Sequence, residues 1–197
     1  MIRNIILDMG NVLLTYEPET YAGRLCSEEA APYVLRELFL GLDWAKQDLG
    51  LVGKKELYDL VRPRVPEAFH QDLWTAVDHW SDLMRPVPGA AEFLREMHGL
   101  GYRLYVLSNA GTDFYEYFPR NYDTGIFSGI VVSCDLHVTK PDRRIYEYLL
   151  ETYGLDPSEC IFADDLPQNI LGAEECGISG FLFRSDFNAL KEQIRKC

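Results

Sequence analysis

Six polar side chains that suit acid–base or phosphoryl chemistry end short apolar runs or stand just before expected helices. They are Asp8, Ser108, Asn109, Lys140, Asp164 and Asp165. The apolar runs, such as IRNIIL and CIFA, have the length and composition of buried strands. The carboxyl ends of parallel strands meet at one edge of a sheet, where α/β enzymes bind their ligands. We therefore expect one site that combines carboxylates, a hydroxyl, an amide and an amine.

The charges of these groups predict a metal ion. Asp8, Asp164 and Asp165 repel one another at close range, and one lysine cannot neutralise three carboxylates. Either some carboxylates are protonated or a hard divalent cation is bound, and oxygen ligands at this density suit Mg²⁺. Mg²⁺ and Lys140 together supply enough positive charge to accept a phosphate dianion. The sequence therefore favours a magnesium site that receives a small phosphorylated metabolite.

A bound phosphate would give the remaining groups distinct tasks. Ser108 and the backbone N–H groups beside it, at Asn109, would hold the phosphate oxygens, while Lys140 balances the charge on Asp8 and on the phosphate. Asp8 could then attack phosphorus and form an aspartyl-phosphate that water hydrolyses. We expect Asp8 and Lys140 to be catalytic, and Ser108, Asn109 and Lys140 to bind the phosphate.

Alternating strand and helix patterns predict the elements that position these groups. Strands are expected over residues 2–9, 102–109, 129–133, 160–165 and 180–183. Helices are expected over about 88–98, 112–118 and 167–176, from Pro141 onward, and from Asp186 to the end of the chain. Strands separated by helices form βαβ units and a parallel sheet. The expected fold class is α/β, a Rossmann-like parallel sheet flanked by helices.

Residues 16–85 interrupt this alternation and contain no convincing strand. Apolar residues recur at helical spacing in KKELYDLV and PEAFHQDLWTAVDHWSDLM, and Ser27 with two glutamates after it is typical of a helix start. We interpret the segment as an inserted all-helical cap domain on a core domain of residues 1–15 and 86–197. An insertion just after Asp8 would overhang the ligand-binding edge of the sheet.

The composition of the 197-residue chain limits the classes of function. Its net charge of −12 argues against a nucleic-acid partner, because nucleic acids are bound through lysine and arginine. The apolar runs are strand-sized, so we expect no membrane helix, and the N-terminus does not resemble a signal peptide. Five scattered cysteines, Cys197 among them, suit reduced thiols in a cytoplasmic protein. The sequence leaves the oligomeric state open.

The motifs DMGNV, VLSN, KPDRRIY and FADDLPQNI resemble, in order and spacing, those of the haloacid dehalogenase-like hydrolases. The resemblance covers essentially the whole chain and extends to the subgroup with an early helical cap. Within that subgroup the chain is most similar to members that resemble bacterial α-D-glucose-1-phosphate phosphatases, which share a D-x-G-N-V first motif. The resemblance implies that the protein is a Mg²⁺-dependent hydrolase.

The resemblance also implies a role for each motif residue. Asp8 would be the nucleophile that accepts the phosphoryl group, and Ser108 would be the phosphate-binding hydroxyl. Asp165 would be a direct ligand of Mg²⁺, with Asp164 as its partner behind it. Gly10 would contribute its backbone carbonyl to the metal.

The residue two positions after the expected nucleophile departs from the pattern of most phosphatases in this family. They carry an aspartate there, which protonates the leaving alcohol and later activates water, whereas this chain has Gly10. General acid–base catalysis contributes ~10²–10⁴-fold to a rate. Its loss therefore matters, but it need not abolish activity.

Gly10 leaves three functions open. We favour a phosphatase whose substrate, such as a sugar phosphate, has a good leaving group, or whose acid comes from elsewhere in the chain. The second function is that of a weak or inactive protein that binds a phosphorylated ligand or a partner. The third is a 2-haloacid dehalogenase, which works without a metal, and the pair Asp164 and Asp165 argues against it.

A few residues outside the motifs are candidates for substrate contact. In the cap they are Trp44 and Asp48, in the segment DWAKQDLG. Near the nucleophile, Asn11 suits either a turn with an unusual φ or a contact that positions Asp8.

Other cap residues have simpler interpretations. Trp74 and Trp80 recur at helical spacing, which predicts that they belong to the core of the cap. His70 and His79 titrate near neutrality and could replace the missing acid, but no spacing places either of them over the nucleophile.

Overall fold

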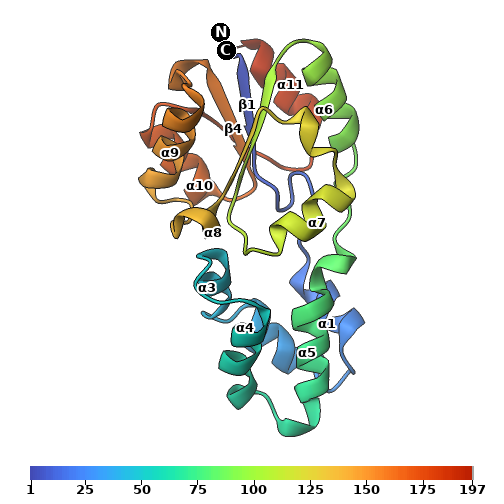
Figure 1. The fold of residues 1–197 in the computed structure, drawn as a ribbon. Coiled ribbons are helices and arrows are strands. Elements are labelled where there is room, and N and C mark those ends of the chain that lie inside the picture. The colour runs from blue at the N-terminus through green and yellow to red at the C-terminus, as the bar shows by residue number, and fades with distance from the viewer. Residues whose placement is uncertain (197) are drawn as a thin grey trace.

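The computed structural model describes residues 1–196, and a parallel five-stranded sheet forms its centre (Figure 1). The strands are β1 (Asn4–Leu7), β2 (Arg103–Ser108), β3 (Gly129–Val132), β4 (Cys160–Asp164) and β5 (Ser179–Leu182). Their order is β3-β2-β1-β4-β5, and every neighbouring pair is parallel. The predicted α/β fold is therefore confirmed. Cys197, expected to end the last helix as a reduced thiol, lies outside the described residues.

Helices cover both faces of the sheet. They are α6 (Ala90–Gly99), α7 (Phe114–Asn121), α8 (Ser133–Leu136), α9 (Arg143–Tyr153), α10 (Pro167–Glu175) and α11 (Phe187–Lys196), with 3₁₀ turns at Thr124–Ile126 and Pro157–Glu159. In Figure 1, α9 and α10 lie on one side of the sheet, and α6 and α11 on the other.

The central strand β1 is buried on both faces, which is typical of parallel sheets. Successive strand residues point to opposite faces, so Ile5 and Leu7 pack in one apolar cluster with Phe93 of α6. Ile6 points the other way and packs in a second cluster with Leu149 of α9. The two clusters fix the sheet between its helical layers and so fix the strand ends.

The chain between β1 and α6 contains only helical regular elements. They are α1 (Pro18–Leu25), α2 (Ala31–Val34), the π-helical turn η1 (Leu35–Phe39), α3 (Trp44–Asp48), α4 (Lys54–Val61), α5 (His70–His79), and 3₁₀ turns at Arg62–Arg64, Glu67–Phe69 and Trp80–Leu83. Figure 1 shows these helices beyond the carboxyl ends of the strands, away from the N-terminus. We call residues 18–83 the helical lobe. The exact domain boundaries stay a prediction.

Among the expected helix starts that differ from the structure, two are explained by hydrogen bonds. Ser27 does not cap a helix: its backbone N–H donates to the Asp72 carboxylate at 2.6 Å, and α2 begins four residues later. The helix expected from Pro141 begins two residues later, because Asp142 accepts the Arg144 N–H at 2.9 Å and caps it.

None of the described helices combines the length and the apolar character that a membrane crossing requires.

Candidate active site

The order of the strands brings the expected acids together. β1 lies between β2 and β4, so Asp8, just after β1, lies beside Asp164 at the end of β4. The Asp8 N–H donates to the Ala163 carbonyl at 2.9 Å and holds Asp8 in register with β4. Carboxylate oxygens of Asp8, Asp164 and Asp165 lie within 4.8 Å of one another. We call these three residues the acidic cluster.

Lys140 joins two of these carboxylates. Its Nζ donates to Asp8 Oδ1 and to Asp164 Oδ2, both at 2.7 Å, and its side chain is almost fully buried. Burial opposes the charge, but the two carboxylates outweigh it and raise the pKa of Lys140. Lys140 is therefore a fixed cation at the centre of the site.

Asn109 holds the backbone of Lys140 in place. The Asn109 side chain accepts the Lys140 N–H at 2.7 Å and donates to the Lys140 carbonyl at 3.0 Å. Both ends of the amide are engaged in this way. The structure thus gives the Asn109 side chain a positioning contact that the sequence did not suggest, and its contact with phosphate stays a prediction for the backbone.

The Asp8 carboxyl group is buried and resists ionisation. Burial raises the pKa of Asp8 to about 7, because Lys140 offsets only part of the desolvation and Asp164 adds repulsion. Its Oδ1 also accepts the Met9 N–H at 2.7 Å, whereas no donor within residues 1–196 reaches Oδ2. A divalent cation at the cluster would favour the ionised form.

The donor set of the acidic cluster fits a hard cation such as Mg²⁺, which takes oxygen ligands. Asp165 Oδ2 accepts from the Asn11 amide at 3.0 Å, and in the described chain Oδ1 has no donor. Both oxygens of Asp164 accept from the Asn169 amide, at 3.1 and 3.0 Å. Asp8 and Asp165 thus each have an uncommitted oxygen, whereas Asp164 has none.

Gly10 and Asn11 build the turn after Asp8. Asn11 adopts a φ of 55°, a left-handed conformation that asparagine tolerates, and its Oδ1 accepts the Tyr16 N–H at 2.9 Å. Of the two uses that the sequence left open for Asn11, the turn with an unusual φ is confirmed, and the amide nitrogen contacts Asp165 rather than Asp8. A Cβ built on Gly10 would lie 3.9 Å from its nearest neighbours, so the backbone leaves room for a side chain.

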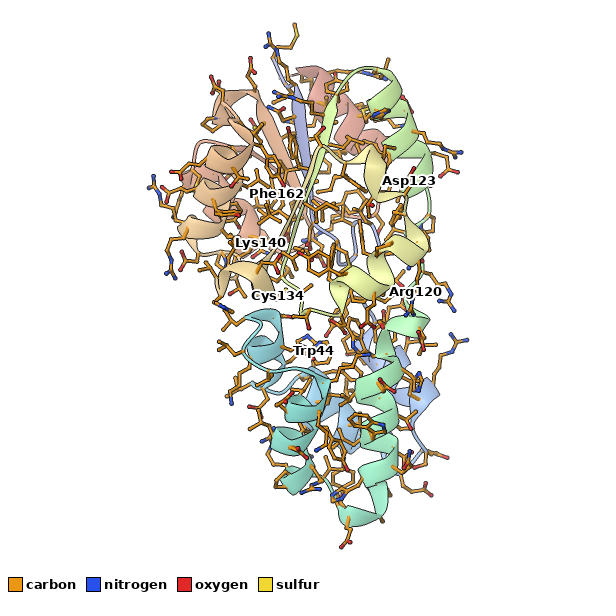
Figure 2. All side chains as sticks on the ribbon, viewed as in Figure 1. Trp44, Arg120, Asp123, Cys134, Lys140 and Phe162 are labelled. Carbon is orange, nitrogen blue, oxygen red and sulfur yellow. The ribbon has the colours of Figure 1, made fainter. Side chains whose placement is uncertain are left out.

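A cavity of about 380 Å³ lies between the acidic cluster and the helical lobe. Asp8, Lys140 and Asp165 line its sheet side. Five of its other lining residues are aromatic: Tyr16, Phe39, Trp44, Trp80 and Tyr117. Figure 2 shows Lys140 on the sheet side and Trp44 on the lobe side of this region. The cavity therefore joins a charged end to an apolar, aromatic end.

Ser108 ends β2 but does not line this cavity. It is fully buried, and its Oγ has no hydrogen-bond partner within residues 1–196. A buried hydroxyl without a partner costs free energy unless a ligand or water meets it. The expected contact between Ser108 and phosphate stays a prediction.

The structure separates the cap residues that the sequence singled out. Trp44 and Asp48 both line the cavity, as expected of substrate contacts. Trp80 is buried, as expected of core, but it lines the cavity as well. His70 bonds to a backbone carbonyl and His79 lies on the surface, and neither lines the cavity.

Gln47 and Tyr117 are among the cavity-lining residues that sequence reasoning missed. The Gln47 amide lies 3.4 Å from the buried Asp113 carboxylate of the core. Tyr117 follows the aromatic pattern FYEYF on α7, in which Phe114, Tyr117 and Phe118 recur at helical spacing and are buried. That pattern was a usable signal, whereas nothing in the sequence marks Gln47.

Comparison with known proteins gives the family context. A family model described as haloacid dehalogenase-like hydrolase matches residues 2–177. The sesquiterpene phosphatase astK of Aspergillus oryzae is 24% identical over 176 residues, which are 89% of this chain and 86% of that protein. A glyceraldehyde 3-phosphate phosphatase of Methanothermobacter thermautotrophicus is 31% identical over 117 residues, 58% of this chain and 52% of that protein.

Solved structures show the same fold. A haloacid dehalogenase family enzyme of Bacteroides thetaiotaomicron, in complex with magnesium and inorganic phosphate, superposes with a TM-score of 0.73. The match covers 96% of this chain and 99% of that one, at 23% sequence identity. The likeness extends over both the sheet and the helical lobe.

Proposed function

Because the chain belongs to the haloacid dehalogenase-like hydrolase family, we propose that it is a Mg²⁺-dependent phosphatase that acts on a small phosphorylated metabolite. Asp8 attacks phosphorus and forms an aspartyl-phosphate, which water then hydrolyses. The observation that carries this proposal is the Asp8–Lys140 pair, 2.7 Å apart beside two further carboxylates at the charged end of a cavity. Relatives named as phosphatases support it.

The acidic cluster divides the work among its members. Lys140 holds Asp8 by Oδ1 and favours its ionised form, and Asp164 in turn holds Lys140. Asp8, Asp165 and the Gly10 carbonyl would hold Mg²⁺, since Asp8 and Asp165 keep an uncommitted oxygen. When bound, the ion neutralises charge on the phosphate and orients it. A neighbour of the same fold was solved with magnesium and inorganic phosphate, which supports a magnesium-dependent reaction.

The two ends of the cavity receive the two ends of the substrate. At the charged end, Asn109 lines the cavity and its backbone meets phosphate oxygens, and the unpartnered hydroxyl of the buried Ser108, one residue earlier, would join it when phosphate binds. At the other end, Trp44 and the neighbouring rings offer an apolar wall that suits a sugar ring or a hydrocarbon face. A volume of about 380 Å³ limits the substrate to a small molecule.

Two other functions remain as alternatives. Gly10 in place of the usual acid favours a weak or inactive protein that binds a phosphorylated ligand or partner. A metal-independent 2-haloacid dehalogenase would attack carbon through Asp8 and needs no proton for the halide, but it leaves the Asp164 and Asp165 carboxylates without a metal ion to serve.

A panel of phosphate esters, assayed with Mg²⁺ and with EDTA, separates the three functions. We expect phosphate release that requires Mg²⁺ and that Asp8→Asn abolishes. Asp59→Asn, at an exposed carboxylate of the helical lobe paired with Lys55, is the matched control and should retain wild-type turnover. Mg²⁺-dependent turnover by Asp8→Asn would disprove the mechanism. Ligand binding without any turnover would indicate an inactive protein, and halide release from 2-haloacids in EDTA a dehalogenase.

A further inference from the structure

The segment that carries Asp48 is fixed against the core. The Asp48 carbonyl accepts the Ser133 hydroxyl at 2.5 Å, and the Ser133 oxygen accepts the Ala110 N–H at 3.0 Å. The carbonyl of the next residue, Leu49, lies 2.7 Å from His137 Nδ1. One serine hydroxyl thus ties the end of α3 to the loop after β2, which lines the cavity.

The Asp48 carboxyl group, in contrast, has no partner. It lines the same cavity as Asp8 and Lys140 and is only partly exposed. No donor and no cation within residues 1–196 forms a hydrogen bond or ion pair with it. A carboxyl group held in place through its backbone, with both oxygens uncommitted, is free to exchange a proton with a ligand.

The other titratable residues of the cavity have different tasks or unsuitable pKa values. Lys140 and the acidic cluster are committed to each other and to the phosphate end. Burial raises the pKa of Tyr16 and that of Tyr117 well above the usual range, so neither releases a proton near neutral pH. Asp48 is the remaining cavity-lining acid in the described chain.

We propose that Asp48 is the proton donor of the reaction and supplies, from the helical lobe, the acid–base function that Gly10 cannot supply. This inference rests on the proposed phosphatase function. In phosphoryl transfer the attacking and leaving oxygens are roughly in line, so the leaving oxygen points away from Asp8. Asp8 lines the cavity from the sheet side and Asp48 lines it from the helical lobe, so a leaving group bound in the cavity lies on the side of Asp48.

The proton returns to Asp48 over the two half-reactions. When the phosphorus–oxygen bond of the ester breaks, the Asp48 carboxyl group gives its proton to the departing oxygen and the alcohol leaves, while Asp8 keeps the phosphoryl group. The Asp48 carboxylate then takes a proton from the water that attacks phosphorus. Inorganic phosphate leaves, Asp8 is again a free carboxylate, and Asp48 is again protonated.

The surroundings of Asp48 keep its proton available near neutrality. Burial raises the pKa of Asp48 to about 7, with Asp113 adding repulsion and Lys140 opposing the rise. Tyr16 and Tyr117 also interact electrostatically with Asp48, and both are neutral near pH 7. Asp48 therefore carries its proton below about pH 7, and turnover of a substrate that needs the proton should fall as the pH rises through that value.

Asp48→Asn keeps the shape of the side chain and removes the proton, so it is the first test. We expect kcat/KM to fall ~10²–10⁴-fold for an alkyl phosphate such as glycerol phosphate. For p-nitrophenyl phosphate, whose leaving group needs no proton, the loss should stay under about tenfold. The falling limb near pH 7 should also disappear from the alkyl profile. Asp59→Asn, on α4 of the same lobe, should leave kcat/KM unchanged for both substrates.

Two further variants separate proton donation from substrate positioning. Asp113→Asn removes a charge that raises the pKa of Asp48, so the falling limb should move to lower pH while alkyl turnover persists. Gly10→Asp in the Asp48→Asn background places a carboxyl group two residues after Asp8, where the backbone has room. It should restore alkyl turnover by about tenfold or more.

Equal losses for alkyl and aryl phosphates in Asp48→Asn would overturn the inference and leave Asp48 as a substrate contact. A falling limb that survives Asp48→Asn would overturn it too, as would a double variant in which Gly10→Asp rescues nothing. If the wild-type protein hydrolyses no phosphate ester with Mg²⁺, the proposed function fails and takes this inference with it. If the wild-type protein hydrolyses the aryl phosphate but Asp48→Asn shows no selective loss of alkyl turnover, this inference alone is rejected.

Discussion

At the scale of single residues, the site depends most on Lys140. It is almost fully buried, bonds two carboxylates at 2.7 Å each, and has its backbone held by Asn109. Removing one partner of a buried ion pair is costly, because the other charge is left uncompensated. Here one cation compensates two carboxylates, so its loss should affect the fold as well as the chemistry.

Lys140→Met should therefore cost both stability and activity. With Asp8 and Asp164 unpaired, we expect the free energy of unfolding to fall by roughly 3–5 kcal/mol at pH 8 without magnesium. The loss should shrink at pH 5, because burial raises the pKa of Asp8 and its carboxyl group takes up a proton as the pH falls. Urea unfolding at both pH values measures this. Lys55→Met, at a surface pair with Asp59, should cost under about 1 kcal/mol, and an equal cost would contradict the argument.

The raised pKa of Asp48 leads to an independent prediction about the stability of the protein. Its pKa is about 7 in the folded protein against 3.8 for a free side chain, so the folded state binds more protons between these values and stability falls as the pH rises across them. Asp48→Asn should raise the free energy of unfolding at pH 8 by on the order of 2 kcal/mol, about half the full linkage value because the side chain is partly exposed. At pH 4, urea unfolding should find the variant and the wild type equal. Equal gains at both pH values would mean that the stabilisation is unrelated to the carboxyl charge.

The sequence predicted which acids meet, but not how they are held. Asp8, Asp164 and Asp165 could be placed together because polar residues at the ends of parallel strands share one edge of the sheet. The contact of Asn11 with Asp165 spans 154 positions of the chain and depends on the turn that Asn11 itself makes. Side-chain hydrogen bonds of this kind follow from three-dimensional packing, which spacing along the chain does not encode.

At the scale of elements, the turn after α3 sets the position of Asp48. Gly50 has a φ of 65°, and a Cβ built on it would clash with the carbonyl oxygen of Cys134 on α8. Gly50→Ala must therefore push the end of α3 away from the core. We expect kcat/KM for an alkyl phosphate to fall by about tenfold or more, the cost of a misplaced proton donor.

Gly154→Ala is the matched control for this variant. Gly154 ends α9 with a φ of 59°, and no atom lies within 4 Å of an added Cβ. It should show the backbone penalty of the left-handed conformation, about 1–2 kcal/mol in the free energy of unfolding, with unchanged kinetics. Steady-state kinetics and urea unfolding of both variants test this, and equal kinetic losses would refute a specific role for the α3 turn.

The elements of the sheet were easier to predict than those of the helical lobe. Four of the five strands are short apolar runs that end at or just before a polar residue, and β1 is buried on both faces, so the pattern is strong. In the lobe, α2 begins after Ala30 without a side-chain cap, and the chain continues into a π-helical turn over Leu35–Phe39. Packing against neighbouring helices, rather than a local signal, sets these boundaries.

At the scale of the whole molecule, the aromatic side of the cavity joins the two parts of the chain. The Trp80 ring lies 5.2 Å from that of Trp44 in the helical lobe and 5.5 Å from that of Tyr117 on α7, which belongs to the core. The lobe, which lies beyond the carboxyl ends of the strands in Figure 1, therefore contacts the core through rings that also line the cavity. A substrate held there would contact both parts of the chain at once.

The same arrangement concentrates negative charge in a protein whose net charge is already −12, and this predicts a global effect of magnesium. The carboxylates of the acidic cluster lie within 4.8 Å of one another with one lysine between them, so an ion that binds only the folded state should stabilise it. At about 100 times its dissociation constant, Mg²⁺ would add ~2.7 kcal/mol. For a chain of this size that corresponds to a rise of roughly 5–10 °C in Tm.

Asp165→Asn removes a charge with an uncommitted oxygen and should abolish most of the rise, whereas Asp59→Asn should keep it. Thermal unfolding in MgCl₂, against NaCl of equal ionic strength, measures the effect. A rise that NaCl reproduces, or that survives Asp165→Asn, would show that general screening and not the acidic cluster is responsible.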